Sequence, residues 1–418
     1  MRRVIATLLA FCLLPAPAFA GLAEAEANAL KDEIRHLTEA VEALTRTVQR
    51  QESRIQELEA EKREPEAKAE RPAPVSLPVV RAEAPKGLSV FNPEIGAVAD
   101  IVAKLTESGE DGEGNDKISV RHLELVLGHD VDPFTRMDVV LGLSDYEHHI
   151  HVGEAYITRW ELPWDTKIRL GRVRPKVGKS APLHLGMLDT VDQPLVVQSY
   201  LGHEGLARTG IEGNWFLPEF ADTLTQELSL NLSEGGVGEG GALFGETSRR
   251  PSFFGHLKNA WDINDENTFE LGATYLTGAK GEEENFDVHS LGLDATWIAY
   301  PTPSTRLKWQ SEVYLQHRED TDPGLSNDPW GMYSLLDYRL GPKWGTGLRF
   351  DYVELVDAPI SNPRSADMGA AAYLTFYQSE FARWRAQVQH VECAEGGNDN
   401  RFYLQGTFAI GVHKHQLQ

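Results

Sequence analysis

The chain has 418 residues and a formal net charge of -23, because 63 acidic side chains outnumber 40 basic ones. Binding to a nucleic-acid backbone needs clustered cations, so this balance argues against nucleic acid as a partner. Charged residues interrupt every apolar stretch beyond residue 20. This excludes membrane-spanning helices but permits a β-barrel, whose strands need only about ten residues with alternate ones apolar.

Residues 1–20, MRRVIATLLAFCLLPAPAFA, have the pattern of a cleavable secretory signal peptide. A basic start precedes an apolar run, and small residues end the segment before Gly21, where the mature chain is expected to begin. The apolar run is shorter than the roughly 20 residues of a membrane-spanning helix, which argues against an anchor. Cleavage would remove Cys12 and leave Cys393 alone, so we expect no intramolecular disulfide.

Residues 21–63 are predicted to form an α-helical coiled coil. Apolar residues recur there at alternating spacings of four and three: Leu30, Ile34, Leu37, Val41, Leu44, Val48, Ile55 and Leu58. This is a heptad repeat with Ile or Val at a and Leu at d. A single amphipathic helix that packs on the protein itself is the alternative, but the strict register favours oligomerisation. The residue types at a and d favour two strands, whereas the polar Gln51 in the seam suits three, so the number stays open.

Residues 64–88 are predicted to form a linker between this coiled coil and the remainder of the chain. The segment holds five prolines among Ala, Glu, Lys and Arg: Pro65, Pro72, Pro74, Pro78 and Pro85. Such a composition favours extended polyproline conformations and forms no core. We therefore expect a semi-rigid spacer.

Residues 89–418 repeat one pattern, in which ten to fifteen residues of period-two alternation are followed by a turn. The repeat predicts sixteen strands, near 94–106, 118–129, 134–145, 151–161, 166–176, 208–217, 224–234, 251–263, 269–279, 286–299, 306–318, 329–340, 346–356, 367–379, 384–394 and 400–414. An even number is expected of a bacterial single-chain barrel. The predicted fold class is therefore an all-β transmembrane barrel of about 16 antiparallel strands, preceded by the N-terminal coiled coil.

The alternation and the connections both indicate a transmembrane barrel. Leu291 and Leu293 alternate with Ser290 and Asp294, which is the apolar-out and polar-in pattern of such barrels. A soluble β-sandwich would also alternate, but here short connections such as LPWD alternate with long acidic or Gly-rich ones. Tight periplasmic turns and longer outer loops are typical of outer-membrane barrels. This count places both ends of the barrel, and hence the coiled coil, on the periplasmic side.

Four segments resemble a group of Gram-negative outer-membrane porin-like proteins: FNPEIGAVAD at 91–100, GRVRPKVGKSAPLHLGMLDTVDQPLVVQSYLGHEGL at 171–206, LTFYQSEFARWRAQ at 374–387 and FYLQGTFAIGVHKHQ at 402–416. This group is distantly similar to phosphate-selective porins, and some members are labelled zinc-regulated TonB-dependent outer membrane receptors. The resemblance implies a channel narrowed by a constriction loop, residues 177–207, after the fifth strand. A TonB-dependent receptor needs a 22-stranded barrel with a plug, so we set that label aside.

Charged residues around the constriction loop are the candidate pore site: Arg172, Arg174, Lys176, Lys179, Asp189, Asp192 and Glu204. The first three share one parity, which predicts a basic ladder on the lumenal face of the fifth strand. A basic wall that faces an acidic loop would create a transverse field across a narrow aqueous gap. The equally favoured alternative is that the cations pair with the loop acids and hold the loop down.

A histidine-rich outer loop, residues 145–151, is a candidate metal site. His148, His149 and His151 lie there beside two carboxylates, and imidazole with carboxylate suits zinc. A polar exposed loop is the alternative, and it is the favoured one. Zinc is therefore a possible ligand, and no other cofactor is implied.

The sequence predicts an outer-membrane porin or channel for passive diffusion of small polar solutes or ions. We expect it to contact outer-membrane lipid and to form a homotrimer through the coiled coil and the barrel. The alternative is a zinc-binding outer-membrane surface protein or receptor that uses loop 145–151. The sequence contains no nucleophile elbow, phosphate loop or HExxH motif, so we do not predict an enzyme.

Overall fold

A computed structural model describes residues 93–107, 117–144, 150–218, 223–234, 250–280, 286–319, 328–356, 365–394 and 396–411. The predicted signal peptide (1–20), coiled coil (21–63) and linker (64–88) lie outside these residues. The chain divides into two units, Met1–Pro85 and Lys86–Gln418, and the second contains all the described residues.

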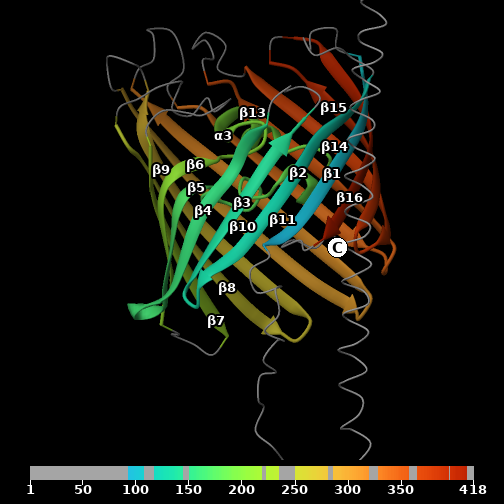
Figure 1. The fold of residues 1–418 in the computed structure, drawn as a ribbon. Helices are drawn as coiled ribbons and strands as arrows, with labels where there is room; N and C mark the ends of the chain where they lie inside the picture. Colours follow the sequence, from blue (N-terminus) through green and yellow to red (C-terminus); the bar gives the residue numbers. More distant parts are fainter. Residues whose placement is uncertain are drawn as a thin grey trace, which may run out of the picture. The chain divides into compact units, whose positions relative to one another are not determined.

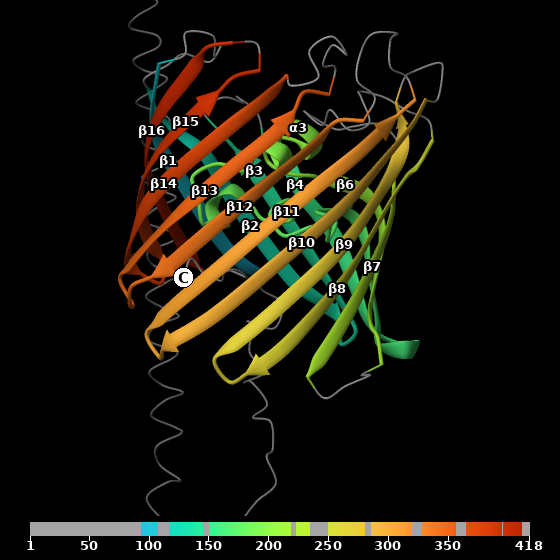
Figure 2. The same ribbon diagram turned by 180° about the vertical axis from the view of Figure 1, so that it is seen from behind.

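The described residues form sixteen antiparallel strands that close into a barrel (Figures 1 and 2). The strands are β1 (Glu94–Thr106), β2 (Lys117–Asp132), β3 (Thr135–Leu143), β4 (His151–Leu162), β5 (Thr166–Val173), β6 (Arg208–Phe216), β7 (Leu224–Ser233), β8 (Ser252–Asn264), β9 (Asn267–Lys280), β10 (Phe286–Thr302), β11 (Thr305–Arg318), β12 (Trp330–Arg339), β13 (Trp344–Glu354), β14 (Ala366–Ser379), β15 (Ala382–Glu392) and β16 (Asn398–Gly411). The predicted number and order of strands are confirmed.

Pairing between the first and last strands closes the barrel. The register of β1 and β16 runs without a shift from Gly96 opposite Gly411 to Thr106 opposite Arg401. Every other strand pairs with its neighbours in sequence. Closure leaves no edge strand that would expose a row of unpaired ladder groups.

Apolar side chains point outward and polar ones inward, the reverse of a soluble protein. On β10, Leu291 and Leu293 are 56% and 57% exposed, whereas Ser290 and Asp294 are 2% and 3% exposed. The alternation predicted for this strand is confirmed. Exposed leucines and isoleucines continue around the barrel, and examples are Leu105, Leu170, Ile211, Leu232, Leu315, Leu348, Leu374 and Leu404.

Large exposed aromatic side chains gather near the short turns. Phe134, Trp164, Phe216, Tyr300, Trp344, Phe381 and Trp384 are all exposed, and each lies in or within four residues of a short connection. Such residues form girdles at the membrane interface of outer-membrane barrels.

The connection between β5 and β6 folds into the barrel. It includes the 3-10 helix η4 (Leu185–Met187) and the helix α3 (Leu195–Leu201). Both views place α3 inside the ring of strands (Figures 1 and 2), and α3 contacts β12 and β13. Within the described part of the chain, no helix is long and apolar enough to cross a membrane.

Candidate functional site

The candidate site is the interior of the barrel, here called the lumen, together with residues 174–207, here called the inward loop. Polar or charged side chains dominate the inward faces of the strands. Examples from around the wall are Asp100, Glu154, Glu212, Ser229, Thr274, Glu312, Arg349, Arg385 and Gln405, all at most 7% exposed. Side chains of this kind favour hydrated solutes over apolar ones.

An apolar patch seats one part of the inward loop against the wall. Val196, Val197 and Tyr200 of α3 are at most 1% exposed and belong to a buried cluster with Tyr333 and Val353 of the wall. A Cβ built on Gly331 of β12 would lie 2.7 Å from Val196 Cγ2, so beside a valine at 196 only glycine admits the helix at this distance. Burial of these side chains offsets the entropy cost of ordering the loop.

Arginines of the wall hold the carbonyl groups of the inward loop. Arg385 donates to the carbonyls of Leu188 (2.9 Å) and Thr190 (2.8 Å). Arg349 donates to the carbonyl of Asp192 at 2.8 Å. Arg121 donates to Val191 O at 2.6 Å, and Arg383 donates to Gly186 O. Buried carbonyls need such donors, and one guanidinium can serve several at once.

Carboxylates of the wall hold the amide groups of the same loop. Glu312 on β11 accepts from Lys179 N at 2.9 Å and from Ser180 N at 2.8 Å. Asp351 on β13 accepts from Leu195 N at 3.0 Å. The wall therefore satisfies both the donors and the acceptors of a backbone that forms little secondary structure of its own.

Charged side chains of the loop pair with opposite charges on the wall. Lys176 pairs with Glu227, and Lys179 with Glu270. Asp189 pairs with Lys308, and Asp192 with Arg349 at 3.0 Å. The loop cations thus lie against acidic parts of β7 and β9, and the loop acids against basic parts of β11 and β13.

Two carboxylates and one imidazole of the loop have pKa values that are shifted by charged side chains of the wall. Burial alone would raise the pKa of Asp189, but Lys308, together with Arg385 and Arg306, outweighs burial and holds that pKa below its usual range. Burial opposes Arg349 in the same way at Asp192, whose pKa is also lowered. Burial would lower the pKa of His184, but Glu124 leads the opposing interactions, which raise the pKa to about 9.

The predicted basic ladder on the fifth strand is wrong. β5 ends at Val173, so Arg174 and Lys176 lie in the inward loop and share no strand face with Arg172. Arg172 is half-buried and lies opposite the exposed Thr209. The strand ends early because the chain turns inward here, where Lys176 N is bound by Glu212 at 3.1 Å.

The cations and acids of the predicted pore set pair mostly with the wall and not with one another. The one pair inside the set joins Arg174 Nη2 and Glu204 Oε2 at 3.9 Å, and Arg174 also donates to the carbonyl of Glu204. The sequence-based prediction did not include the wall arginines or Glu312. Their positions in the apolar-polar alternation of their strands mark them as facing the lumen. Parity does not reveal which inward side chains meet the loop.

The structure describes only one of the three histidines of the predicted metal site, His151. His148 and His149 lie outside the described residues. His151 begins β4 and lies near His122 of β2 and Glu204 of the inward loop, two residues that the histidine-rich sequence did not indicate.

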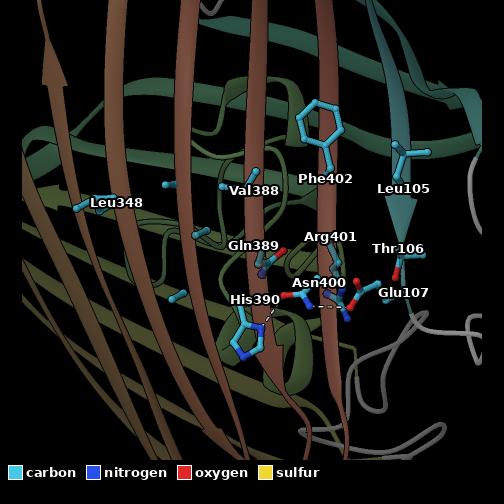
Figure 3. A pocket seen from close by; sticks show the side chains of 13 residues that line it. Leu105, Thr106, Glu107, Leu348, Val388, Gln389, His390, Asn400, Arg401 and Phe402 are labelled. Atoms are coloured by element: carbon cyan, nitrogen blue, oxygen red, sulfur yellow. Dashed lines mark hydrogen bonds between the residues drawn. The ribbon is translucent and has the colours of Figure 1, made fainter.

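A groove of about 760 Å³ lies on the outward side of β13 to β16 and β1 (Figure 3). Ala370 and Ala372 leave space there between the longer side chains of Leu348, Val388 and Phe402. These three longer side chains are 41% to 59% exposed on the outside of the barrel. The groove is therefore separate from the lumenal site.

A closed antiparallel barrel with an apolar outside, a polar lumen and a long loop folded inward is the architecture of outer-membrane β-barrels. Comparison with solved structures agrees: the chain has the fold of the Gram-negative outer-membrane porins.

Three similar structures are OprB of Pseudomonas putida, an anion-selective porin from Comamonas acidovorans and the trimer form of OmpT from Vibrio cholerae. OprB is 10% identical with a TM-score of 0.53, over 76% of this chain and 94% of that chain. The anion-selective porin is 12% identical with a TM-score of 0.52, over 76% and 99%. OmpT is 9% identical with a TM-score of 0.50, over 76% and 99%.

One relative in sequence is described as an uncharacterized protein of Aquifex aeolicus (strain VF5). It is 27% identical over 338 residues, which cover 73% of this chain and 71% of the relative. No protein-family model matches the chain.

Proposed function

We propose that the protein is an outer-membrane porin that lets small polar solutes or ions diffuse passively through its lumen. The observation that carries the proposal is the combination of a polar wall with a loop anchored inside it by Arg349, Arg385 and Glu312. A loop held on both its carbonyl and its amide groups keeps one shape, which a permanent constriction needs. Diffusion down a gradient requires no cofactor or energy source.

The outer membrane is the location that the outward surface fits. Leucines and isoleucines cover the outside, and exposed aromatic side chains surround the short-turn end. A hydrocarbon layer bounded by interfaces matches such a surface. In this arrangement the short turns face the periplasm, and the coiled coil predicted for residues 21–63 lies there too.

We assign the constriction to the inward loop and to the charged residues paired with it. In the pair Lys176–Glu227 the loop carries the positive charge and the wall the negative one. In the pair Asp189–Lys308 the signs are exchanged. Each of these pairs is in direct contact and anchors the loop. We propose that a transverse field arises between the acidic and the basic parts of the wall, across the opening that the loop leaves free, and that low-dielectric surroundings strengthen it.

A homotrimer is the assembly that we propose, held by the coiled coil and by contacts between barrels. One similar structure, OmpT of Vibrio cholerae, is described in a trimer form. If the N-terminal helices of three chains all lie on the periplasmic side, their coiled coil would hold the three barrels side by side in the membrane.

Single-channel conductance in planar lipid bilayers tests the proposal. Purified protein without its signal peptide should give stable steps at all modest voltages, and conductance should rise in proportion to salt concentration. A matched control is the same preparation after heat unfolding, which should give no steps. Folded protein that inserts into the bilayer but never conducts would contradict the porin function.

A further inference from the structure

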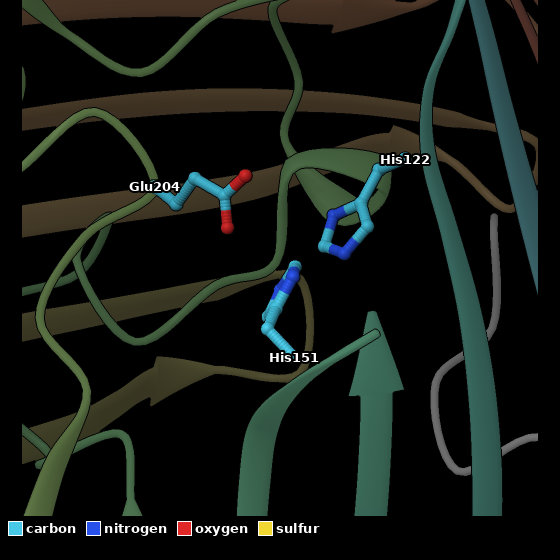
Figure 4. Close-up of side chains that lie close together, drawn as sticks. All are labelled: His122, His151 and Glu204. Atoms are coloured by element: carbon cyan, nitrogen blue, oxygen red, sulfur yellow. The ribbon is translucent and has the colours of Figure 1, made fainter. Parts of the chain in front are cut away.

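Two histidines of the wall and one carboxylate of the inward loop converge at the long-loop end of the lumen. His122 lies on β2, His151 begins β4, and Glu204 follows α3 (Figure 4). One potential ligand atom from each lies within 4.8 Å of the other two. The geometry points to a binding site for a divalent transition-metal ion, of which zinc is the best match.

The donor set suits zinc in type and in number. Two imidazoles and one carboxylate form a three-ligand set that leaves the fourth tetrahedral position for water. Zn–N and Zn–O bonds of about 2.0–2.2 Å place ligand atoms roughly 3.4 Å apart in a tetrahedron. The three ligand atoms lie within 4.8 Å of one another, so no separation exceeds the tetrahedral value by more than about 1.4 Å, a difference that side-chain rotation can close.

His122 gives an independent indication of a ligand. Its side chain is buried, with 6% of the residue exposed. Its Nε2 has no hydrogen-bond partner among the described residues. A buried ring nitrogen without a partner loses free energy that a bound metal ion would restore. The other ring nitrogen of His122, Nδ1, lies 3.6 Å from Glu124 Oε1. Zinc-bound histidines commonly have a carboxylate beside the ring nitrogen that does not bind the metal.

Gly142 of β3 keeps the space between the two rings open. It pairs opposite Glu124 on β2 and opposite His151 on β4. A Cβ at this position would lie 2.3 Å from His151 Nε2 and 2.8 Å from His122 Nε2. The two Nε2 atoms therefore face one common space, which an alanine would fill without removing a ligand.

A metal ion at this site would join the inward loop to the wall. Glu204 is the only one of the three ligands that belongs to the loop, and its side chain is 45% exposed. Arg174 keeps this part of the loop in place by donating to the Glu204 carbonyl. Metal binding would therefore add a second fixed point near the C-terminal end of the loop.

Zinc binding to full-length mature protein in detergent, after removal of bound metal with a chelator, tests the site. Calorimetric titration should show one site, and His122→Ala and Gly142→Ala should each weaken its affinity about tenfold or more. The control His317→Ala removes an exposed histidine of β11, whose Nδ1 lies 2.7 Å from Asp328 Oδ1. This variant should bind zinc as tightly as the parent does. Conductance of each variant shows whether the barrel is intact.

A second readout separates this site from the histidine-rich loop. Cobalt(II) should give the visible absorption bands of a tetrahedral site in the parent and in a His148→Ala, His149→Ala double variant, but not in His122→Ala. Loss of binding in the double variant, or full binding in both His122→Ala and Gly142→Ala, would overturn the proposal. Either result leaves the proposed porin function untouched, because conductance is measured separately.

Discussion

His184 Nδ1 lies 2.6 Å from Glu124 Oε1, so a side chain of the inward loop is paired with β2 across 60 sequence positions. The opposite ring nitrogen, Nε2, lies 3.0 Å from Glu154 Oε1 on β4. A protonated imidazole can donate to both carboxylates at once. The pair of contacts explains why the pKa of His184 rises to about 9 although burial opposes protonation.

This arrangement predicts that attachment of the loop weakens in alkaline solution. Because the folded pKa of about 9 exceeds the ordinary value of about 6.5, the stabilisation is complete below about pH 6.5 and is lost as the pH rises through 9. His184→Gln should remove this pH dependence and on the order of 2–3 kcal/mol at pH 6. Thermal unfolding between pH 6 and 10 measures both effects. The control His203→Gln alters an exposed histidine of the same loop, and an equal loss in that variant would contradict the assignment.

Arg349 should be the most sensitive single anchor of the loop. It contacts Thr190, the carbonyl and carboxylate of Asp192, and Asp351, and it is 2% exposed. Arg349→Ala leaves the buried Asp351 and the partly buried Asp192 without their ionic partner, and loss of a buried partner typically costs about 3–5 kcal/mol.

We expect this variant to show greater protease sensitivity of the loop and noisier single-channel currents than the parent. The control is Arg159→Ala, which breaks an exposed pair with Asp132 at 3.4 Å and should cost at most about 1 kcal/mol. Currents of parental quality from Arg349→Ala would show that the loop does not depend on this anchor.

Most of the barrel could be predicted from the sequence because strand alternation and turn composition are local signals. The predicted bounds of β10 and β14 differ from the observed ones by at most three residues. The fifth strand was predicted to end at 176 and ends at Val173. Alternation continues beyond its end, and only contacts with the distant Glu212 and Glu227 draw Lys176 inward.

The candidate site was less predictable because its partners are far apart in sequence. The resemblance implied that loop 177–207 narrows the channel, and the structure places this loop inside the barrel. Arg385 and Leu188 are 197 positions apart, and no local pattern joins them. His122 was missed for the same reason, since a single histidine in a strand gives no ligand signal until the fold brings His151 beside it.

Ion selectivity should depend on the positively charged side chains of the inward loop, such as Lys176. The Lys176 side chain is 36% exposed and pairs with Glu227. Lys176→Gln leaves a less compensated carboxylate in the lumen, so the reversal potential in a salt gradient should shift towards cation preference. The control Lys343→Gln removes an exposed charge in the short turn between β12 and β13, where solvent and salt screen it. Equal shifts in both variants would mean that the charge near the loop does not control selectivity.

The predicted coiled coil should hold the assembly together. A peptide of residues 21–63 should be helical and oligomeric, because its heptads bury apolar a and d positions only in an oligomer. Cross-linking and light scattering in detergent should give three copies of the mature chain, and fewer after deletion of residues 21–63. A helical peptide that stays monomeric would favour the alternative of a single helix packed on the protein.

A cysteine pair can test whether the inward loop stays seated while the channel conducts. The Cβ of Val196 lies 3.2 Å from the position that a Cβ on Gly331 would take, close to the 3.5–4.5 Å of disulfides. Val196→Cys with Gly331→Cys, in a chain that also carries Cys393→Ser, should therefore form a bond between α3 and β12 on mild oxidation. Because α3 is already packed there, conductance should be the same before and after oxidation. The single variant Val196→Cys, in which Gly331 is kept, serves as the control for oxidation itself. Currents that fall on oxidation of the pair alone and return with a reducing agent would show instead that conduction requires α3 to leave the wall.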